Sequence, residues 1–256
     1  MIIYFSGTGN SYAVARELGA LTQDQVIPLD KKNWEAIGLL LQSAKSVGLV
    51  FPVYFGDVPK PVLKFLKKAT LSPQAYYYAA ATCGSTQGSA LYRVQELLGA
   101  KGCKLSYGRV VPMIANSTST WKVGVTYDYS KLEKAKQLVE AMGQDILARK
   151  VDLSQVKKSL AGTLMAIPLV RKLGKKRFAI SARPKDCVGC GLCVRLCPMG
   201  NLSLKDGKVK VHDHCAYCMA CVQFCPHGGI AVHGHVIAKA DQYHHPEVQA
   251  QELFHR

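Results

Sequence analysis

The chain has 256 residues, which is enough for one large domain or two smaller ones with packed cores. Its 48% hydrophobic content fits a globular protein, and no apolar stretch reaches the roughly 18 residues that a membrane-spanning helix needs. The N-terminus lacks the charged region and cleavage site of a signal peptide, so we expect a cytoplasmic protein. The formal charge of +16 leaves an acidic protein, an anionic membrane and nucleic acid open as partners.

Five short apolar runs alternate with helix-like segments over the first 150 residues. The runs are MIIYF (1–5), QVIPL (25–29), SVGLVFPV (46–53), AYYYAAAT (75–82) and YGRVVPMIA (107–115). Continuous apolar strands that alternate with helices are typical of a parallel sheet covered on both faces. A last helical pattern occupies 131–150, so we predict an α/β domain over 1–150.

The sequence SGTGNS follows the first predicted strand, at the start of a helix-like segment. It lacks the third glycine of a dinucleotide fingerprint, because Tyr12 stands three residues after Gly9, and it lacks the lysine of a Walker loop. Backbone N–H groups at a helix N-terminus bind phosphate, and the hydroxyls of Ser6, Thr8 and Ser11 would add hydrogen bonds. Without the lysine, the loop favours a terminal monophosphate over a polyphosphate that undergoes transfer.

Eight of the ten cysteines lie between residues 187 and 225, in two copies of C-x2-C-x2-C-x3-C-P. Three thiolates on one tight loop can reach three irons of a [4Fe–4S] cluster, whereas the fourth cysteine is carried toward the neighbouring cluster. We therefore assign one cluster to Cys187, Cys190, Cys193 and Cys225, and the other to Cys215, Cys218, Cys221 and Cys197. Zinc ribbons present C-x2-C pairs at longer separations, so the spacing favours iron–sulfur clusters over zinc.

The two cysteine copies lie in a predicted small domain over 178–240, which resembles the bacterial-type ferredoxins with two [4Fe–4S] clusters. Between the copies, LSLKDGKVKV reads as a hairpin that turns at Asp206-Gly207. So little apolar mass indicates a domain held together by metal. The tail over 241–256 is expected to be a short helix or disordered, and the eight histidines of the chain to occupy scattered solvent positions.

The phosphate loop resembles the flavodoxin pattern [ST]-x-T-G-N-[ST], which matches at Ser6, Thr8, Gly9, Asn10 and Ser11. That resemblance implies a five-stranded, doubly wound parallel sheet with strand order 2-1-3-4-5 and FMN at the carboxyl ends of the strands.

The flavodoxin resemblance also implies two later loops around the FMN ring, PVYFGDVP (52–59) and TCGSTQGS (82–89). In the first, Tyr54 or Phe55 would stack on the flavin and the Gly56 peptide would rotate to meet the reduced N5. The second contains no aromatic residue, which predicts a more open ring face. The expected contacts are Pro52, Val53, Tyr54, Phe55, Gly56, Thr82, Cys83, Gly84 and Ser85.

A basic segment, 151–177, separates the two predicted domains. Residues 149–177 carry nine lysines and arginines and one acid, Asp152, around the apolar stretch 160–170 that Pro168 interrupts. A linker helix with a solvated basic face is the simpler interpretation. Peripheral membrane contact or a docking surface is the alternative.

The two halves together resemble the flavodoxin–ferredoxin fusion family, the EFR-type ferredoxins. This resemblance implies an electron-transfer protein that passes low-potential electrons between two [4Fe–4S] clusters and FMN, and on to a redox partner. The basic charge fits an acidic partner, and we expect no nucleic acid. The alternative is an FMN-dependent reductase that acts on a small substrate with electrons fed through the clusters; no residue is assigned a catalytic role.

Overall fold

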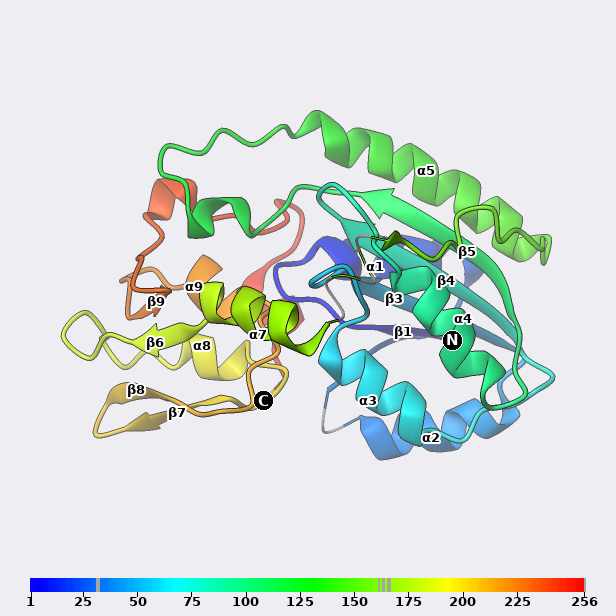
Figure 1. Cartoon of the computed structure of the whole chain (residues 1–256), viewed down its shortest axis with the longest axis horizontal. Helices are drawn as coiled ribbons and strands as arrows, with labels where there is room; N and C mark the ends of the chain where they lie inside the picture. Colours follow the sequence, from blue (N-terminus) through cyan, green and yellow to red (C-terminus); the bar gives the residue numbers. More distant parts are fainter. Residues whose placement is uncertain (31–32, 161, 163, 165–166, 256) are drawn as a thin grey trace.

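The computed structural model describes all residues except 31–32, 161, 163, 165–166 and 256 (Figure 1). A region built on a five-stranded sheet lies beside a smaller region that carries the clustered cysteines. Helix α7 (Pro168–Arg177) lies where the two regions meet. None of the helices that the structure describes is long and apolar enough to cross a membrane.

All five predicted strands form, and they pair in parallel in the order β2-β1-β3-β4-β5. Their bounds are β1 (Ile2–Tyr4), β2 (Val26–Pro28), β3 (Ser46–Pro52), β4 (Tyr76–Cys83) and β5 (Leu105–Pro112). Strand β4 is buried at every position, as expected for a sheet covered on both faces. The predicted flavodoxin-like strand order is confirmed.

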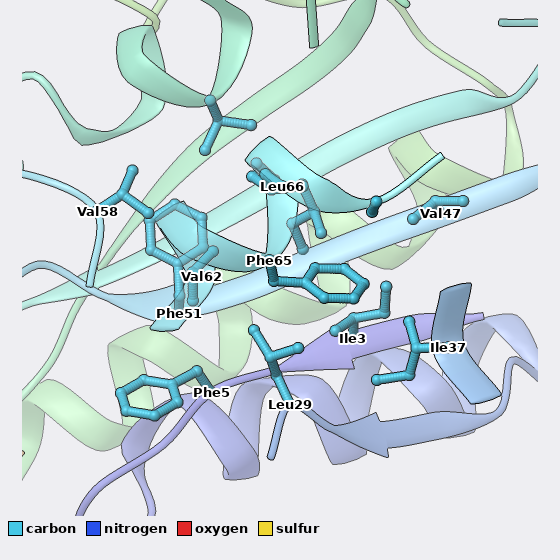
Figure 2. Close-up of a cluster of buried hydrophobic side chains, with 14 of the residues drawn as sticks. Ile3, Phe5, Leu29, Ile37, Val47, Phe51, Val58, Val62, Phe65 and Leu66 are labelled. Atoms are coloured by element: carbon cyan, nitrogen blue, oxygen red, sulfur yellow. The ribbon is translucent and has the colours of Figure 1, made fainter. Parts of the chain in front are cut away.

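Five helices cover the two faces of this sheet. They are α1 (Asn10–Thr22), α2 (Trp34–Ser43), α3 (Lys60–Lys68), α4 (Ala90–Gly99) and α5 (Ser130–Leu147). Helices α2, α3 and α4 pack aliphatic and aromatic side chains on one face, part of which Figure 2 shows around Phe51 and Phe65. Helices α1 and α5 pack on the other face, where Leu18 and Met142 are fully buried.

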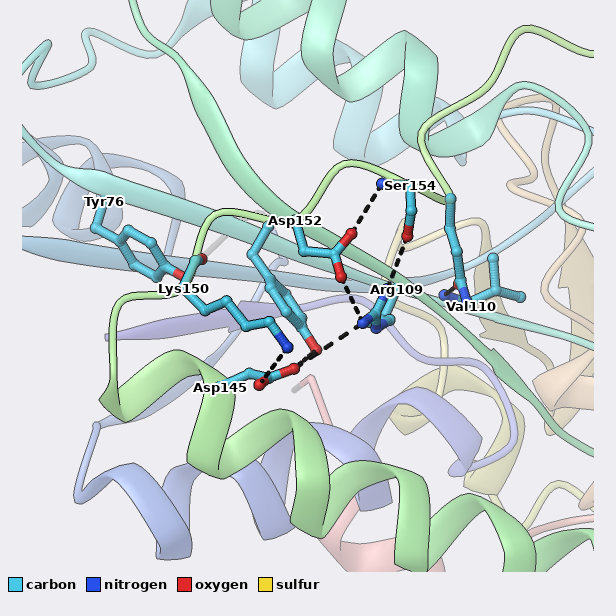
Figure 3. A network of polar contacts seen from close by, with 9 residues as sticks. Tyr76, Arg109, Val110, Asp145, Lys150, Asp152 and Ser154 are labelled. Atoms are coloured by element: carbon cyan, nitrogen blue, oxygen red, sulfur yellow. Dashed lines mark hydrogen bonds and ion pairs between the residues drawn. The ribbon is translucent and has the colours of Figure 1, made fainter.

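The chain after α5 is tied back to the free edge of β5. Arg109 donates to Asp152 at 2.7 Å and lies 3.9 Å from Asp145. Figure 3 shows these residues beside one another. The backbone N–H of Asp152 donates to the Ser106 carbonyl, and the side chain of Gln155 accepts from the Val110 N–H. The first residues of the predicted linker therefore extend the edge of the sheet.

The cysteine region contains two short antiparallel sheets and two single-turn helices. Strand β6 (Ile180–Ala182) pairs with β9 (Ile230–Val232), and β7 (Leu202–Lys205) pairs with β8 (Lys208–Val211). Helices α8 (Leu192–Arg195) and α9 (Ala220–Gln223) carry the third cysteine of each motif, Cys193 and Cys221. The predicted hairpin is confirmed: Asp206 and Gly207 form its turn with φ of 52° and 71°.

The segments outside these two regions are ordered where the structure describes them. Pro168 occupies the first turn of α7, where its missing N–H is tolerated, so it begins a helix instead of breaking one. The remaining short 3₁₀ helices are η1 (Thr118–Thr120), η2 (Lys239–Asp241) and η3 (Ala250–Leu253). The tail is not disordered, since Tyr243, Val248 and Leu253 are buried.

Candidate cofactor sites

The phosphate loop forms the turn between β1 and α1. Gly9 is the N-cap of α1 with a φ of 99°, a left-handed conformation that glycine adopts without strain. A Cβ at this position would lie 2.9 Å from the Cβ of His245, so the C-terminal tail packs directly behind the loop. No side chain caps α1, and the first-turn N–H groups point from its positive end, as an anion site requires.

A cavity of about 540 Å³ opens at the carboxyl ends of the strands, beside this loop. It brings together every predicted cofactor-binding residue except Gly9, which faces the tail. The predicted residues that line it are Ser6, Thr8, Asn10, Ser11, Pro52, Val53, Tyr54, Phe55, Gly56, Thr82, Cys83, Gly84 and Ser85. Burial raises the pKa of the Cys83 thiol, which favours the neutral form.

Two of the loop hydroxyls are already engaged within the protein. Ser11 Oγ lies 2.7 Å from Thr82 Oγ1 and ties the phosphate loop to the end of β4. Thr8 Oγ1 accepts a hydrogen bond from the side chain of Asn116 at 3.1 Å. The loop is therefore fixed in position by side chains from β4 and from the segment after β5.

The two loops expected to surround the flavin ring, 52–59 and 82–89, are hydrogen-bonded to each other. The Gly56 carbonyl accepts from the Ser89 N–H at 2.8 Å, and a Cβ on Gly88 would lie 2.2 Å from the same oxygen. Tyr54 packs edge-on against Phe5 and exchanges backbone hydrogen bonds with Asp57. Rotation of the Gly56 peptide, as the flavodoxin resemblance implies, would break its bond to Ser89.

Three further aromatic residues, from outside the two predicted ring loops, line the cavity. Trp121, Phe178, Phe55 and Tyr217 form a chain of edge-on ring contacts with successive centroid distances of 5.3, 5.5 and 5.7 Å. They come from four separate segments, so no local sequence motif identifies them as a group. The cavity wall therefore includes aromatic residues from the segment after β5 and from the cysteine region, in addition to the two predicted ring loops.

The eight clustered cysteines surround two small cavities, in the predicted groups. Cys187, Cys190, Cys193 and Cys225 line one, and Cys197, Cys215, Cys218 and Cys221 line the other. We call these groups the outer and the inner quartet, because Cys190 is exposed whereas Cys218 and Cys221 are buried. Within the described residues, no three His, Cys, Asp or Glu side chains converge closely enough to hold a single metal ion.

The surroundings of the thiols oppose their ionisation. Burial raises the pKa of Cys218 and Cys221, and neighbouring thiols of the inner quartet raise both further. In the outer quartet, burial together with Cys225 and Cys190 raises the pKa of Cys193 to about 12. Thiolate ligands here require a bound cation or cluster to offset desolvation and mutual repulsion.

Backbone N–H groups point at cysteine sulfurs in both quartets. The N–H of Asn201 lies 3.2 Å from Cys197 Sγ, and those of Tyr217 and Gly229 lie 3.2 Å from Cys215 and Cys225 Sγ, respectively. In the second cysteine motif, 215–225, two residues other than glycine have left-handed φ angles, 62° for Tyr217 and 63° for Met219. Such strain is characteristic of a ligand-binding loop.

The inner quartet touches the phosphate loop. A Cβ at Gly7 would lie 2.4 Å from the Cys218 carbonyl oxygen, a distance that only glycine permits. The side chain of Asn116 donates to that carbonyl at 3.2 Å as well as to Thr8. Gln223 of α9 in turn donates to the Asn116 carbonyl and accepts from the Tyr243 N–H. Sequence reasoning missed Asn116, since its role depends on contacts with residues about one hundred positions away in either direction.

Comparison with known proteins agrees with this division of the chain. The family described as "4Fe-4S dicluster domain" matches residues 186–230, which include all eight clustered cysteines. A comparison with curated proteins finds no match.

Among solved structures, the chain is similar over its N-terminal part to three proteins. The Trp repressor binding protein from Bacillus subtilis shows 11% identity and a TM-score of 0.42, over 55% of this chain and 95% of that one. An FMN-dependent NADH-azoreductase from Bacillus anthracis shows 11% identity and a TM-score of 0.40, over 57% and 98%. The flavodoxin of Megasphaera elsdenii shows 16% identity and a TM-score of 0.36, over 56% and 99%.

The observed strand order identifies the N-terminal fold, and the matched family identifies the cysteine region. The chain therefore joins a sheet region with the flavodoxin-like strand order to a region that matches a 4Fe–4S dicluster domain, a combination that supports a redox role.

Proposed function

We propose that this chain is an electron-transfer protein that passes low-potential electrons between two [4Fe–4S] clusters and FMN, and on to a redox partner. The observation that carries the proposal is that the inner quartet and the large cavity share a wall, so that residues of one site contact residues of the other. The Cys218 carbonyl, inside the inner quartet, contacts Gly7 and Asn116 beside the phosphate loop, and Met219 lines the large cavity.

The large cavity suits FMN in shape and chemistry. Its lining includes the lysine-free loop at the N-terminus of α1, which suits a monophosphate. The rest of its lining includes Tyr54, Phe55, Trp121 and Tyr217, whose aromatic faces and edges suit a planar ring. When bound, FMN exchanges electrons singly or in pairs, whereas each cluster exchanges one.

The two quartets suit [4Fe–4S] clusters and differ in their access to solvent. The inner quartet adjoins the FMN cavity, and we assign it the exchange of electrons with the flavin. The outer quartet lies near the surface, where Val188 and Leu204 are exposed and Lys208 donates to the Cys187 carbonyl. We assign this basic and partly apolar end to an acidic redox partner in the cytoplasm.

The proposal is tested by the rate of flavin reduction in anaerobic protein mixed with a dithionite-reduced bacterial-type ferredoxin. We expect Cys218→Ser to slow the reduction by about tenfold or more, because it removes a ligand of the inner quartet. Cys103→Ser is the matched control, since Cys103 is buried in the sheet region outside both quartets. Equal rates in the wild type and Cys218→Ser would contradict a relay through the quartets.

The same preparation distinguishes an electron carrier from a reductase that acts on a small substrate. Asp57, an acid of the first ring loop, is buried and accepts from the Val58 N–H at 2.7 Å. We therefore expect fast electron transfer to a protein acceptor and little turnover of small molecules. Multiple turnovers with a small acceptor in the absence of a protein acceptor would replace the proposal by the reductase.

A further inference from the structure

The basic segment carries a strip of exposed aliphatic side chains that electron transfer leaves unexplained. Six residues between 160 and 173 form this apolar strip, with exposed fractions from 41% to 87%. They are Leu160, Leu164, Ile167, Leu169, Val170 and Leu173. Large apolar side chains gathered on one exposed segment mark a surface that another body covers.

The positive charge of the segment indicates which kind of surface covers the apolar strip. From 153 to 185 the chain has nine lysines and arginines and no acid. Lys172 and Lys176 are exposed on α7, beside the apolar strip. Aliphatic side chains flanked by cations are typical of a helix that lies in the headgroup region of an anionic bilayer.

The attachment of α7 to the body leaves the apolar strip accessible. Gly174 lies close enough for a Cβ there to contact Phe55 at 3.4 Å, Lys175 lies over the Tyr217 ring, and Arg177 lies over the Trp121 ring. These contacts hold the C-terminal half of the helix against the cavity wall. Leu169 and Leu173 remain 66% and 58% exposed. Both belong to α7, which lies at the junction of the two regions (Figure 1).

A second copy of the chain fits this surface less well than lipid does. A two-fold contact would place the same cations opposite each other, between molecules that each carry a formal charge of +16. An anionic bilayer instead neutralises the cations while it buries the aliphatic side chains. We propose that the apolar strip and the basic helix α7 together form an interfacial anchor that binds the protein to anionic membrane surfaces. This proposal is independent of the electron-transfer proposal.

The test is flotation of the cofactor-loaded chain with vesicles of phosphatidylcholine, with and without phosphatidylglycerol. We expect binding to the anionic vesicles, a loss of at least about tenfold with neutral vesicles, and weakening by salt. The visible absorption and iron content of each variant serve as the check that it is folded. Equal binding to both vesicles, or binding to neither, would overturn the proposal.

Two pairs of variants test whether vesicle binding depends on this segment in particular, or on any loss of exposed leucine or of positive charge at the surface. Leu169→Gln/Leu173→Gln should lose most of the vesicle binding, whereas Leu39→Gln/Leu40→Gln, with two exposed leucines on α2, should retain it. Lys172→Glu/Lys176→Glu should lose it, whereas Lys67→Glu/Lys68→Glu on α3 makes the same charge change and should not.

Equal effects within either pair would overturn the proposal. So would a wild-type dimer that dissociates in Leu169→Gln/Leu173→Gln without any vesicle binding, since a second copy would then be the occupant of the apolar strip.

Discussion

The sheet region and the cysteine region are stabilised by different means. The sheet region buries aliphatic and aromatic side chains on both faces of five strands, including Tyr77, Tyr78 and Phe51. The cysteine region has one small apolar cluster of its own, to which Cys221 belongs. Five more of its residues join the core of the sheet region instead, namely Leu196, Met199, Ala216, Cys218 and Ala220. Apolar burial can maintain the first region without cofactors, whereas the second is too small to do so without metal.

Removal of iron should produce the largest effect and should affect the two regions unequally. After anaerobic chelation, we expect backbone amides of 186–230 to lose hydrogen-exchange protection, because the quartets replace a core there. Amides of β3 and β4 should remain protected in the same sample. Full protection of 186–230 in the iron-free protein would show that its apolar cluster suffices.

Gly7→Ala should uncouple the two regions at their contact. The new Cβ would lie 2.4 Å from the Cys218 carbonyl, so that the phosphate loop or the inner cysteine loop must move. We expect FMN affinity to fall by about tenfold, ~1.4 kcal/mol, measured by flavin fluorescence titration. Gly38→Ala on α2 is the control, since nothing lies within 4 Å of its added Cβ, and unchanged affinity in Gly7→Ala would contradict the shared wall.

Asn116→Asp should weaken the same contact by a smaller amount. The carboxylate retains the shape of the amide but cannot donate to Thr8 Oγ1 or to the Cys218 carbonyl. Because the bond to Thr8 is the one that positions the phosphate loop, and one hydrogen bond contributes about 1 kcal/mol, we expect FMN to bind about fivefold more weakly. Asn116→Ala should show a similar loss, and wild-type affinity in both variants would show that these bonds do not position the loop.

The smallest expected effect is a pH dependence from the tail that supports the phosphate loop. The His245 N–H donates to the Thr8 carbonyl, and its Nδ1 accepts from the Glu247 N–H. Burial lowers the pKa of His245 below 6.5; Arg16 and His244 lower it further, while Glu247 opposes them. The unfolded chain therefore binds the proton first, so stability is complete above about pH 6.5 and falls toward the folded pKa.

Chemical denaturation at several pH values measures this effect. The slope attributable to His245 is at most about 1.4 kcal/mol per pH unit, and His245→Gln should reduce the total slope. His233→Gln is the control, because His233 is exposed. An unchanged slope in His245→Gln would place the acid sensitivity elsewhere.

The sequence predicts the parts of this molecule that depend on local pattern. Apolar runs indicated the five strands, the loop around Gly9 indicated a phosphate site, and the cysteine spacing indicated which thiols gather around each cavity. Phe55 was expected beside the ring, but its contacts with Phe178 and Tyr217, and the role of Asn116, escaped prediction because distant segments meet there only after the two regions dock. The buried positions of His245 and His255 also contradict the expected solvent exposure, since the tail packs on the sheet region and His255 pairs with Asp30.

The central claim, one chain that holds two clusters beside one flavin, is tested most directly by cofactor content. Anaerobically purified protein should be assayed for iron, acid-labile sulfide, zinc and flavin, with a visible spectrum of the same sample. We predict about eight irons, about eight sulfides and about one FMN per chain. Zinc in place of iron, or iron without flavin after reconstitution with FMN, would contradict the account.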